Sequence, residues 1–338
     1  MSAANSARYK GWVVEKPRGD FKEYKFARRS PGPREVLVRI AASGVNPLDI
    51  KIRAGIAAHA RQPLPAVLGL DMAGTVEQIG AGVTEFQIGD EVYGMVGGVG
   101  GLQGTLAQFA VVDADLLARK PKKLTMQQAA ALPLSVITAW EGLVDRARVQ
   151  PAERVLVHAG AGGVGHVAVQ LAAAMGAEVF ATVSPEKKEI AERFGAIPID
   201  YRTESVDDYV TRLTAGKGFD IIYDTVGGAT LDASFAAVKR HTGRVVSALG
   251  WGTHSLAPLS FRGASYSGVF TLLPLLTGEG RAHHGEILRR AAELADEGKL
   301  TPLLNERQFS SSEIAAAHAE VERGSLGKIV IDVSQKPR

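Results

Sequence analysis

The segment RVLVHAGAGGVGHVAVQLA, residues 154–172, decides the fold of this chain. It begins with the apolar run Val155-Leu156-Val157, which is typical of a strand buried on both faces. Gly160, Gly162 and Gly165 follow at the spacing G-x-G-x-x-G, and apolar residues then recur with the period of a helix. A strand, a glycine turn and a helix in this order are the context in which the motif indicates a dinucleotide site.

Each residue of this turn has an expected physical role. Gly160 permits the tight turn, Gly162 lets the backbone approach a pyrophosphate, and Gly165 allows the helix to pack closely on the strand. Gly163 and Val164 lie at the start of the helix, where unpaired N–H groups and the positive end of the dipole attract phosphates. A glycine-rich turn that binds no ligand is the alternative interpretation.

The composition is that of an ordinary globular protein. The 338 residues exceed what one hydrophobic core usually serves, so we expect two domains. No apolar run is long enough to span a membrane, and residues 1–8 show no secretory signal. The chain contains no cysteine, which excludes disulfides and thiolate metal ligands. A formal charge of +3 suits a protein that handles phosphorylated anions and is too small to indicate nucleic acid.

The chain changes character after Pro121. The preceding part, residues 9–125, predicts a β-rich domain, in which the glycine-rich segment 94–104 fits no phosphate-binding register and is interpreted as a flexible surface loop near a cleft. Ser135 is a plausible N-cap for a helix over residues 136–144. From residue 154 onward, predicted strands and helices alternate, as in a parallel, doubly wound sheet. The remaining C-terminal part lacks this alternation and is expected to complete the first domain.

Motifs that extend over nearly the whole chain point to one family. They lie at residues 44–49, 53–55, 65–74, 83–94, 129–134, 138–140, 158–170 and 224–228. In these motifs the chain resembles the medium-chain dehydrogenase/reductase superfamily, and within it the zinc-free quinone oxidoreductase (ζ-crystallin-like) branch. The resemblance implies an α/β fold with a GroES-like β domain, residues 1–133 and 273–338, and an inserted Rossmann domain, residues 134–272. It also implies a homodimer, and we expect a cytoplasmic enzyme.

The zinc ligands of the alcohol dehydrogenases in this superfamily are absent. Gly44 or its neighbours stand where those enzymes have Cys, Leu70 stands at the usual His position, and the four-Cys structural lobe is missing. A catalytic zinc needs three protein ligands, and the one close pair, His283 and His284, would point different ways on a helix. We therefore expect no metal. A zinc alcohol dehydrogenase and a non-catalytic, NADPH-binding crystallin-like protein are the alternatives.

Hydride transfer without a metal favours an electrophilic acceptor. A quinone or an enone yields a delocalised oxyanion, so its reduction needs only a proton donor, whereas a simple alcohol needs its alkoxide polarised. The expected activity is therefore an NADPH:quinone oxidoreductase or enone reductase acting on a small molecule. Two tyrosines usually lie near the nicotinamide in this branch. Lys51 and Ala57 stand at those positions here, a pattern closer to relatives that reduce activated carbon–carbon double bonds.

Three polar residues in one segment are the catalytic candidates. Asn46 is expected to hydrogen-bond the substrate carbonyl or the nicotinamide amide, with an Asx turn before Pro47 as the alternative. By its position in the family, Lys51 is expected to stabilise an enolate or donate a proton if burial lowers its pKa, with a solvated lysine as the alternative. Asp49 is the third candidate, and pairing with Arg53 four residues later is its alternative role.

The choice between NADPH and NADH depends on the end of the second strand of the Rossmann domain. An NAD site places an acidic residue about 20 residues after the glycine motif, and no carboxylate stands at that place here. Ser184 and Lys187 supply a hydroxyl and an ammonium, which favour a 2′-phosphate. The resemblance adds Tyr201, which Arg202 follows. Solvated lysines neutralised by Glu186 are the alternative, and we predict NADPH as the cofactor.

Two features near the end of the Rossmann domain complete the prediction. Gly250 and Trp251 follow the predicted strand 244–248, at the sheet edge where ligands bind, so Trp251 is expected to line the nicotinamide pocket unless this is an ordinary surface loop. The predicted last strand, 265–270, precedes the apolar run 272–276. An edge strand with apolar neighbours favours pairing with its symmetry mate, which predicts a homodimer through this region.

Overall fold

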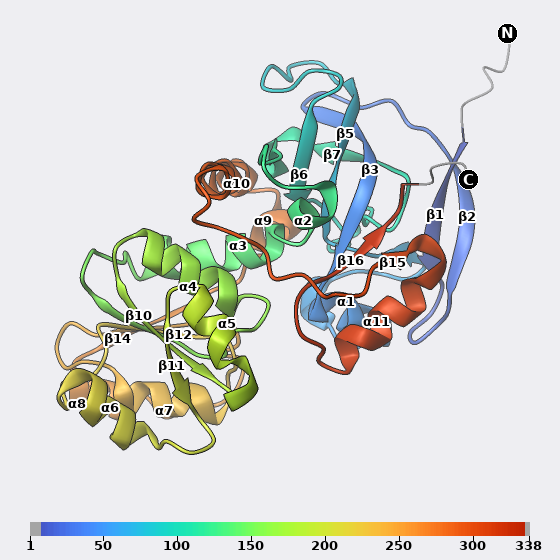
Figure 1. Cartoon of the computed structure of the whole chain (residues 1–338). Helices are drawn as coiled ribbons and strands as arrows, with labels where there is room; N and C mark the ends of the chain where they lie inside the picture. The colour runs from blue at the N-terminus through green and yellow to red at the C-terminus, as the bar shows by residue number, and fades with distance from the viewer. Residues whose placement is uncertain (1–7, 335–338) are drawn as a thin grey trace, which may run out of the picture. The chain divides into compact units, whose positions relative to one another are not determined.

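The computed structural model describes residues 8–334 and divides into two compact units (Figure 1). Unit 1 contains the residues up to Leu134, the segment Leu272–Glu297 and the residues from Pro302 onward. Unit 2 contains Ser135–Thr271 and the tetrapeptide Gly298–Thr301. The chain therefore leaves unit 1 twice and returns to it twice.

Unit 2 is built on a parallel six-stranded sheet. Its strands are β9 (Arg154–Val157), β10 (Glu178–Val183), β11 (Ile197–Asp200), β12 (Ile221–Asp224), β13 (Arg244–Ser247) and β14 (Ser265–Gly268). Their order is β11-β10-β9-β12-β13-β14, and every neighbouring pair is parallel. The order reverses direction at β9, which is the switch point at which such sheets bind ligands. The predicted doubly wound sheet is confirmed.

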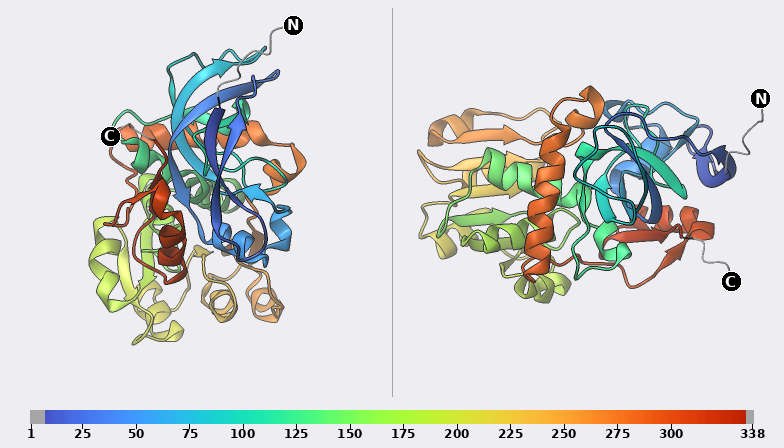
Figure 2. Two further views of the ribbon diagram at one scale, coloured as in Figure 1. Left: turned by 90° about the vertical axis from the view of Figure 1, so that its right-hand side faces the viewer. Right: turned by 90° about the horizontal axis from the view of Figure 1, so that it is seen from above.

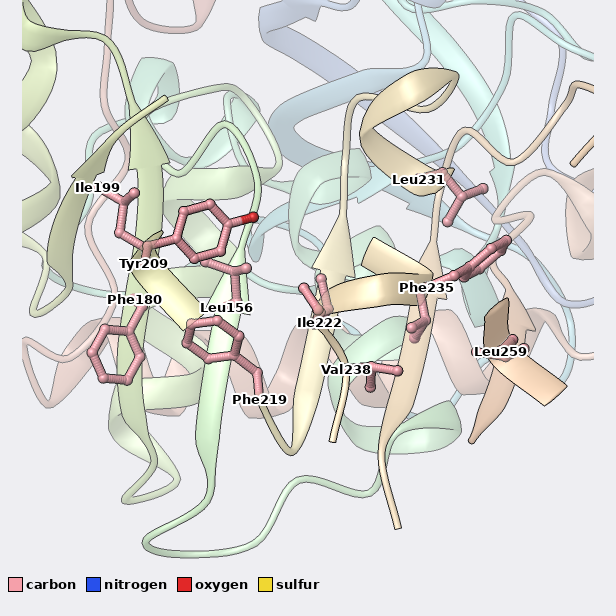
Figure 3. Close-up of a cluster of buried hydrophobic side chains, with 12 residues drawn as sticks. Leu156, Phe180, Ile199, Tyr209, Phe219, Ile222, Leu231, Phe235, Val238 and Leu259 are labelled. Atoms are coloured by element: carbon pink, nitrogen blue, oxygen red, sulfur yellow. The ribbon is translucent and has the colours of Figure 1, made fainter. Parts of the chain in front are cut away.

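Helices cover both faces of this sheet. They are α3 (Pro133–Trp140), which continues into the π-helix η3 (Glu141–Arg146), then α4 (Gly165–Ala174), η4 (Pro185–Lys187), α5 (Lys188–Arg193), α6 (Val206–Thr214), α7 (Ala229–Ala237) and α8 (Ala257–Arg262). α4 and α5 lie on one face, and α6, α7 and α8 lie on the other (Figure 1). Figure 3 shows the core beneath the second group, where Leu156 and Ile222 of the sheet pack with Phe235 of α7.

The helix that precedes the sheet begins at Pro133, so the prediction of Ser135 as its N-cap is wrong. Proline suits the first turn of a helix because it lacks an N–H that would have no partner there. The next donor, Leu134 N–H, bonds to Asp71 Oδ1 at 3.0 Å. A side chain distant in sequence thus satisfies this helix end, and Ser135 lies buried inside the first turn.

Unit 1 contains a seven-stranded sheet and a three-stranded sheet. The larger sheet has β15 (Phe309–Ser310), β16 (Ile329–Asp332), β3 (Glu35–Val45), β5 (Asp71–Ile79), β6 (Glu91–Met95) and β8 (Leu117–Arg119) in this order, with β7 (Phe109–Asp113) paired to β3. The smaller sheet has β2 (Phe21–Ala27), β1 (Arg8–Val14) and β4 (Ala66–Val67). β16 pairs antiparallel with β3, so the C-terminal part does complete the first domain (Figure 1).

Short helices surround these sheets, together with one longer helix. The short ones are α1 (Pro47–Ala54), η1 (Ala58–Ala60), η2 (Ala114–Leu116), α2 (Met126–Ala130), α9 (Leu273–Thr277), η5 (Ser311–Glu313) and α11 (Ile314–Glu322). The longer helix α10 (Arg281–Asp296), orange in Figure 2, packs on β8 and η2, and its Leu288 carbonyl accepts a bond from the Tyr93 hydroxyl. Among the described residues, no helix has the length and apolarity that crossing a bilayer requires.

The glycine-rich segment 94–104 is mostly buried and is not the surface loop that we expected. Its glycines allow backbones to lie against each other: a Cβ on Gly98 would stand 2.6 Å from the Gly69 carbonyl oxygen, and one on Gly104 would stand 2.3 Å from Leu68 backbone atoms. The Gly104 N–H bonds to the Val67 carbonyl at 3.1 Å. The buried glycines of this segment therefore serve packing inside unit 1.

Candidate functional site

The glycine turn between β9 and α4 has the open face that a phosphate site needs. A Cβ on Gly162 would meet nothing within 4 Å except the carbonyl oxygen of Ala159 at 3.0 Å and its Cβ at 3.9 Å. Within the described part of the chain, the N–H groups of Gly163 and Val164 donate to no backbone carbonyl. Free N–H groups at the start of α4 are suited to hold an anionic oxygen.

The other two glycines of the motif are needed for packing. A Cβ on Gly165 would lie 2.1 Å from the Ala159 carbonyl oxygen, which agrees with close contact between helix and strand. A Cβ on Gly160 would lie 2.4 Å from Cβ of Ala181 in β10. The tight turn that we assigned to Gly160 is made instead by Ala159, whose φ is 52°.

The residues chosen for the 2′-phosphate come together at one edge of the sheet. β10 and β11 are parallel with Val183 opposite Asp200, so Ser184 and Tyr201 follow adjacent strand ends. Ser184 is buried, Lys187 is half-buried and Tyr201 is exposed. Lys187 forms no side-chain hydrogen bond or ion pair within residues 8–334, so it is available to a ligand.

Acidic residues are also present at this edge. Glu186 accepts two hydrogen bonds from the Arg202 guanidinium, at 3.2 and 3.4 Å. Lys188 lies 3.7 Å from a carboxylate oxygen of Asp200. The neutralisation by Glu186 that we considered thus involves Arg202 and leaves Lys187 unpaired.

The loop after β13 presents an aromatic side chain at the same carboxyl edge. Trp251 is 54% exposed, and its ring contacts Phe270 edge-on with centroids 6.1 Å apart. Gly250 is required by its surroundings, because a Cβ there would stand 2.1 Å from the Tyr266 hydroxyl. The exposed Trp251 ring is compatible with stacking on a planar ligand.

Sequence reasoning missed three polar residues at the strand ends, His158, Asp224 and Ser247. His158 follows β9, and its Nδ1 lies 3.1 Å from Thr182 Oγ1. Burial lowers the pKa of His158 to about 4, although nearby Asp224 acts in the opposite direction, so the ring is neutral near pH 7. Asp224 accepts a bond from Ser247 at 2.7 Å and from the Gly227 N–H. Polar residues at the ends of otherwise apolar strands were the signal that could have identified them.

In unit 1, the predicted catalytic residues Asn46 and Asp49 lie in a buried polar cluster. Asn46 precedes α1, and its N–H donates to Asp49 Oδ2 at 2.8 Å, which forms a capping box. The Asn46 amide nitrogen donates to Asp71 Oδ2 at 2.9 Å, and Lys328 Nζ donates to the Asn46 amide oxygen. All four side chains are buried. We call Asn46, Asp49, Asp71 and Lys328 the buried cluster.

Burial dominates the electrostatics of this cluster. It raises the pKa of Asp49 to about 7 and that of Asp71 to about 6, and it lowers the pKa of Lys328. Lys328 opposes the rise at both carboxyl groups. Asp71 and Lys328 were not predicted, although a charged residue beside a strongly apolar run was a signal for each.

Lys51 and Arg53 lie outside the buried cluster. Lys51 is exposed on α1, so the burial on which its expected catalytic role depended is not found, and its environment is that of the alternative, a solvated lysine. Arg53 donates to the Gly19 carbonyl at 3.0 Å and lies over the Phe21 ring at 4.9 Å. The alternative that Asp49 pairs with Arg53 is wrong, because the capping bond to Asn46 directs the carboxylate elsewhere.

Within residues 8–334, no group of three or more His, Cys, Asp or Glu side chains is arranged to hold a metal ion. Gly44 stands opposite Asp71 in the β3–β5 pairing, and Leu70 beside it is buried. In α10, His284 is buried whereas His283 is exposed, so the two rings lie in different environments.

Comparison with known proteins agrees with this architecture. Residues 32–122 match the alcohol dehydrogenase GroES-like domain, and residues 195–331 match the zinc-binding dehydrogenase family. The chain is 33% identical over 306 residues to the NADPH-dependent alkenal/one oxidoreductase of Arabidopsis thaliana chloroplasts, covering 88% of this chain and 72% of that protein.

Two solved structures extend the comparison. A crystal structure of an alcohol dehydrogenase superfamily protein from Novosphingobium aromaticivorans has a TM-score of 0.94 and 57% identity, covering 96% of this chain and 100% of that chain. The quinone oxidoreductase from Coxiella burnetii has a TM-score of 0.80 and 28% identity, covering 97% and 100%.

A Rossmann sheet inserted into a GroES-like domain defines the class of alcohol dehydrogenase-like oxidoreductases. The chain belongs to the medium-chain dehydrogenase/reductase superfamily of oxidoreductases, and its relatives there include quinone and enone oxidoreductases.

Proposed function

We propose that the protein is an NADPH-dependent reductase that transfers hydride to a quinone or another activated α,β-unsaturated carbonyl without a metal. The observation that carries this proposal is the gathering of Ser184, Lys187, Tyr201 and Arg202 at the ends of β10 and β11. A hydroxyl, an ammonium and a guanidinium at that edge match the charge of a 2′-phosphate. The name of the Arabidopsis thaliana relative, an NADPH-dependent alkenal/one oxidoreductase, supports the same assignment.

The chemistry of several residues in unit 2 supports NADPH as the proposed cofactor. The N–H groups of Gly163 and Val164 would hold the pyrophosphate beside the open face of Gly162. The exposed ring of Trp251 would contact the nicotinamide end. When bound, NADPH supplies the hydride.

The protein's own groups would support the electrophilic acceptor. Hydride addition to an enone or a quinone puts negative charge on a delocalised oxygen, and a proton must then reach the product. Although it is exposed and not buried as expected, the Lys51 ammonium is our candidate to stabilise that charge. Both polar atoms of the Asn46 amide are engaged within the buried cluster, so we assign Asn46 and Asp49 to positioning α1.

The test is NADPH oxidation measured against a panel of quinones, enones and aldehydes, with NADPH and NADH binding titrated separately. We expect turnover with quinones or enones, preference for NADPH, and no loss of rate after treatment with EDTA. Lys51→Ala should lower kcat while the Kd for NADPH stays unchanged. Tight NADPH binding without turnover of any acceptor would favour the non-catalytic alternative, and one zinc per chain with activity lost on chelation would favour the alcohol dehydrogenase.

A further inference from the structure

A carboxylate of the protein already lies against part of the site that we assign to the 2′-phosphate. Glu186 Oε1 and Oε2 each accept one bond from the Arg202 guanidinium, at 3.2 and 3.4 Å. The Ser184 hydroxyl is close enough to the same carboxylate to help lower the pKa of Glu186. These contacts place an anion within reach of two of the four groups that a 2′-phosphate would use.

We propose that Glu186 stands in for the 2′-phosphate in the free protein and thereby limits the preference for NADPH over NADH. The inference rests on the proposed function. The 2′-phosphate of NADPH must displace the carboxylate from Arg202 before it binds the guanidinium. NADH brings a ribose 2′-hydroxyl instead, which can donate to the Glu186 carboxylate and leave its bond to Arg202 in place.

The local backbone keeps Glu186 at this position. It belongs to the one-turn helix η4, which follows Ser184 directly and begins with Pro185, whose ring restricts the backbone. Arg202 comes from the adjacent strand end, since Val183 of β10 pairs with Asp200 of β11. Lys188 is less available than Arg202 as a cation for Glu186, because its ammonium lies beside the Asp200 carboxylate.

The strength of the Glu186–Arg202 pair sets the size of the effect. Both side chains are more than half exposed, at 58% and 54%. Exposed pairs of this kind are weak, and a phosphate dianion with three acceptor oxygens competes well for a guanidinium. Displacement is therefore possible, and removing the carboxylate should tighten NADPH binding by a factor of about three to five.

The experiment compares wild type with Glu186→Gln, using two fragments of the cofactor as probes. Adenosine 2′,5′-bisphosphate carries the 2′-phosphate and 5′-AMP lacks it, and both are titrated by calorimetry, together with NADPH and NADH. We expect Glu186→Gln to bind the bisphosphate and NADPH several-fold more tightly, to bind 5′-AMP equally well, and to bind NADH more weakly.

Glu189→Gln is the matched control, because Glu189 is an exposed acid three residues later that has no side-chain partner within residues 8–334. Removing Arg202 as well, in Glu186→Gln/Arg202→Gln, should abolish the gain if displacement from Arg202 causes it. An equal gain in Glu186→Gln and Glu189→Gln would overturn the inference, since general charge would then explain it. If Glu186→Gln bound the bisphosphate no more tightly than wild type does, the inference about Glu186 would be overturned and the proposed function would stand. If wild type bound neither NADPH nor the bisphosphate, the proposed function would be overturned as well.

Discussion

Lys328 supplies the cation of the buried cluster, next to two buried carboxyl groups. Removing one partner of a buried ionic group leaves uncompensated charge and typically costs about 3–5 kcal/mol. We therefore expect Lys328→Met to lower the free energy of unfolding by about this amount, measured by urea denaturation. Lys122→Met, which alters an exposed lysine, is the control.

A second variant identifies the cause of that loss. Asp71→Asn removes one of the two carboxylates and keeps an oxygen for the Leu134 N–H. If charge balance is responsible, Lys328→Met/Asp71→Asn should recover part of the stability that Lys328→Met loses. An unfolding midpoint of Lys328→Met equal to that of wild type would show that the cation is dispensable.

His318 on α11 makes the protein sensitive to acid. The ring is buried, neither of its nitrogens has a hydrogen-bond partner in the described chain, and its neighbours are Phe21 and Arg53. Burial, assisted by the Arg53 charge, lowers its pKa to about 3. The unfolded state, with a pKa of about 6.5, binds the proton first, so stability is fully present above that value and falls as the pH drops below it.

His318→Leu should remove this dependence. Between pH 7.5 and pH 5.0, we expect wild type to lose about 2 kcal/mol more unfolding free energy than the variant. The raised pKa values of Asp49 and Asp71 act in the opposite direction, but they do so in both proteins and cancel in the comparison. His241→Asn, at an exposed histidine with positive φ, should follow wild type. Equal losses in wild type and His318→Leu would exclude His318 as the cause.

At the scale of single residues, the sequence identified one half of the buried cluster. Asn46 and Asp49 stand in a motif that the family resemblance singles out, but Lys328 lies 282 positions away from Asn46. The two meet because β16 pairs with β3 in a register that places Val330 opposite Gly44. No local pattern encodes that register, so the partner could not be predicted.

At the scale of elements, two glycines of the turn have different roles: Gly162 leaves space for a ligand, and Gly165 allows α4 to pack closely. Gly162→Ala adds a methyl group beside the Ala159 carbonyl oxygen, at 3.0 Å, on the face left open for a ligand. We expect it to weaken NADPH binding by about tenfold, the equivalent of about 1.4 kcal/mol, with the melting temperature nearly unchanged. Gly165→Ala, whose methyl group would stand 2.1 Å from that oxygen, should instead lose about 1–3 kcal/mol of stability.

Fluorescence titration of NADPH and thermal unfolding of both variants give the two readouts. If Gly162→Ala kept the wild-type Kd, the turn would not be the phosphate site. A Gly165→Ala protein as stable as wild type would show that α4 can shift away from β9.

Periodicity predicted the elements of the Rossmann sheet well, because buried parallel strands are continuous apolar runs that glycine turns separate from helices. Periodicity was less successful where contacts between residues distant in sequence determine the local structure. Segment 94–104 is so rich in glycine that it is interpreted from the sequence as a loop, yet its glycines let it pack against residues 67–69. The start of helix α3 depends on Asp71, which lies in strand β5, 63 residues before Leu134 in the chain.

At the scale of the whole molecule, β14 is an edge strand of unit 2. Its outer side has no partner strand among the described residues, and the nearby side chains of Trp251, Tyr266 and Phe270 are 54%, 36% and 37% exposed. We therefore expect a homodimer in which β14 pairs with its symmetry mate. Light scattering at micromolar concentration should give twice the chain mass, and Phe270→Asp should reduce it toward the monomer.

Ile88→Asp is the control for that experiment, because Ile88 is 67% exposed and belongs to unit 1. A wild-type monomer at this concentration would contradict the prediction, as would a Phe270→Asp protein that dimerises as well as Ile88→Asp.

The tetrapeptide Gly298–Thr301 limits how genes of this kind can recombine. Gln170 of α4 donates to the Thr301 carbonyl at 3.0 Å and accepts from its N–H at 2.8 Å, so unit 2 is complete only with residues encoded beyond α10. A crossover that exchanged codons 135–271 alone would bring in Gln170 without its own partner. The transplanted unit would depend on the recipient's residue at position 301, whose backbone can form the same pair of bonds only if the recipient chain returns along the same path.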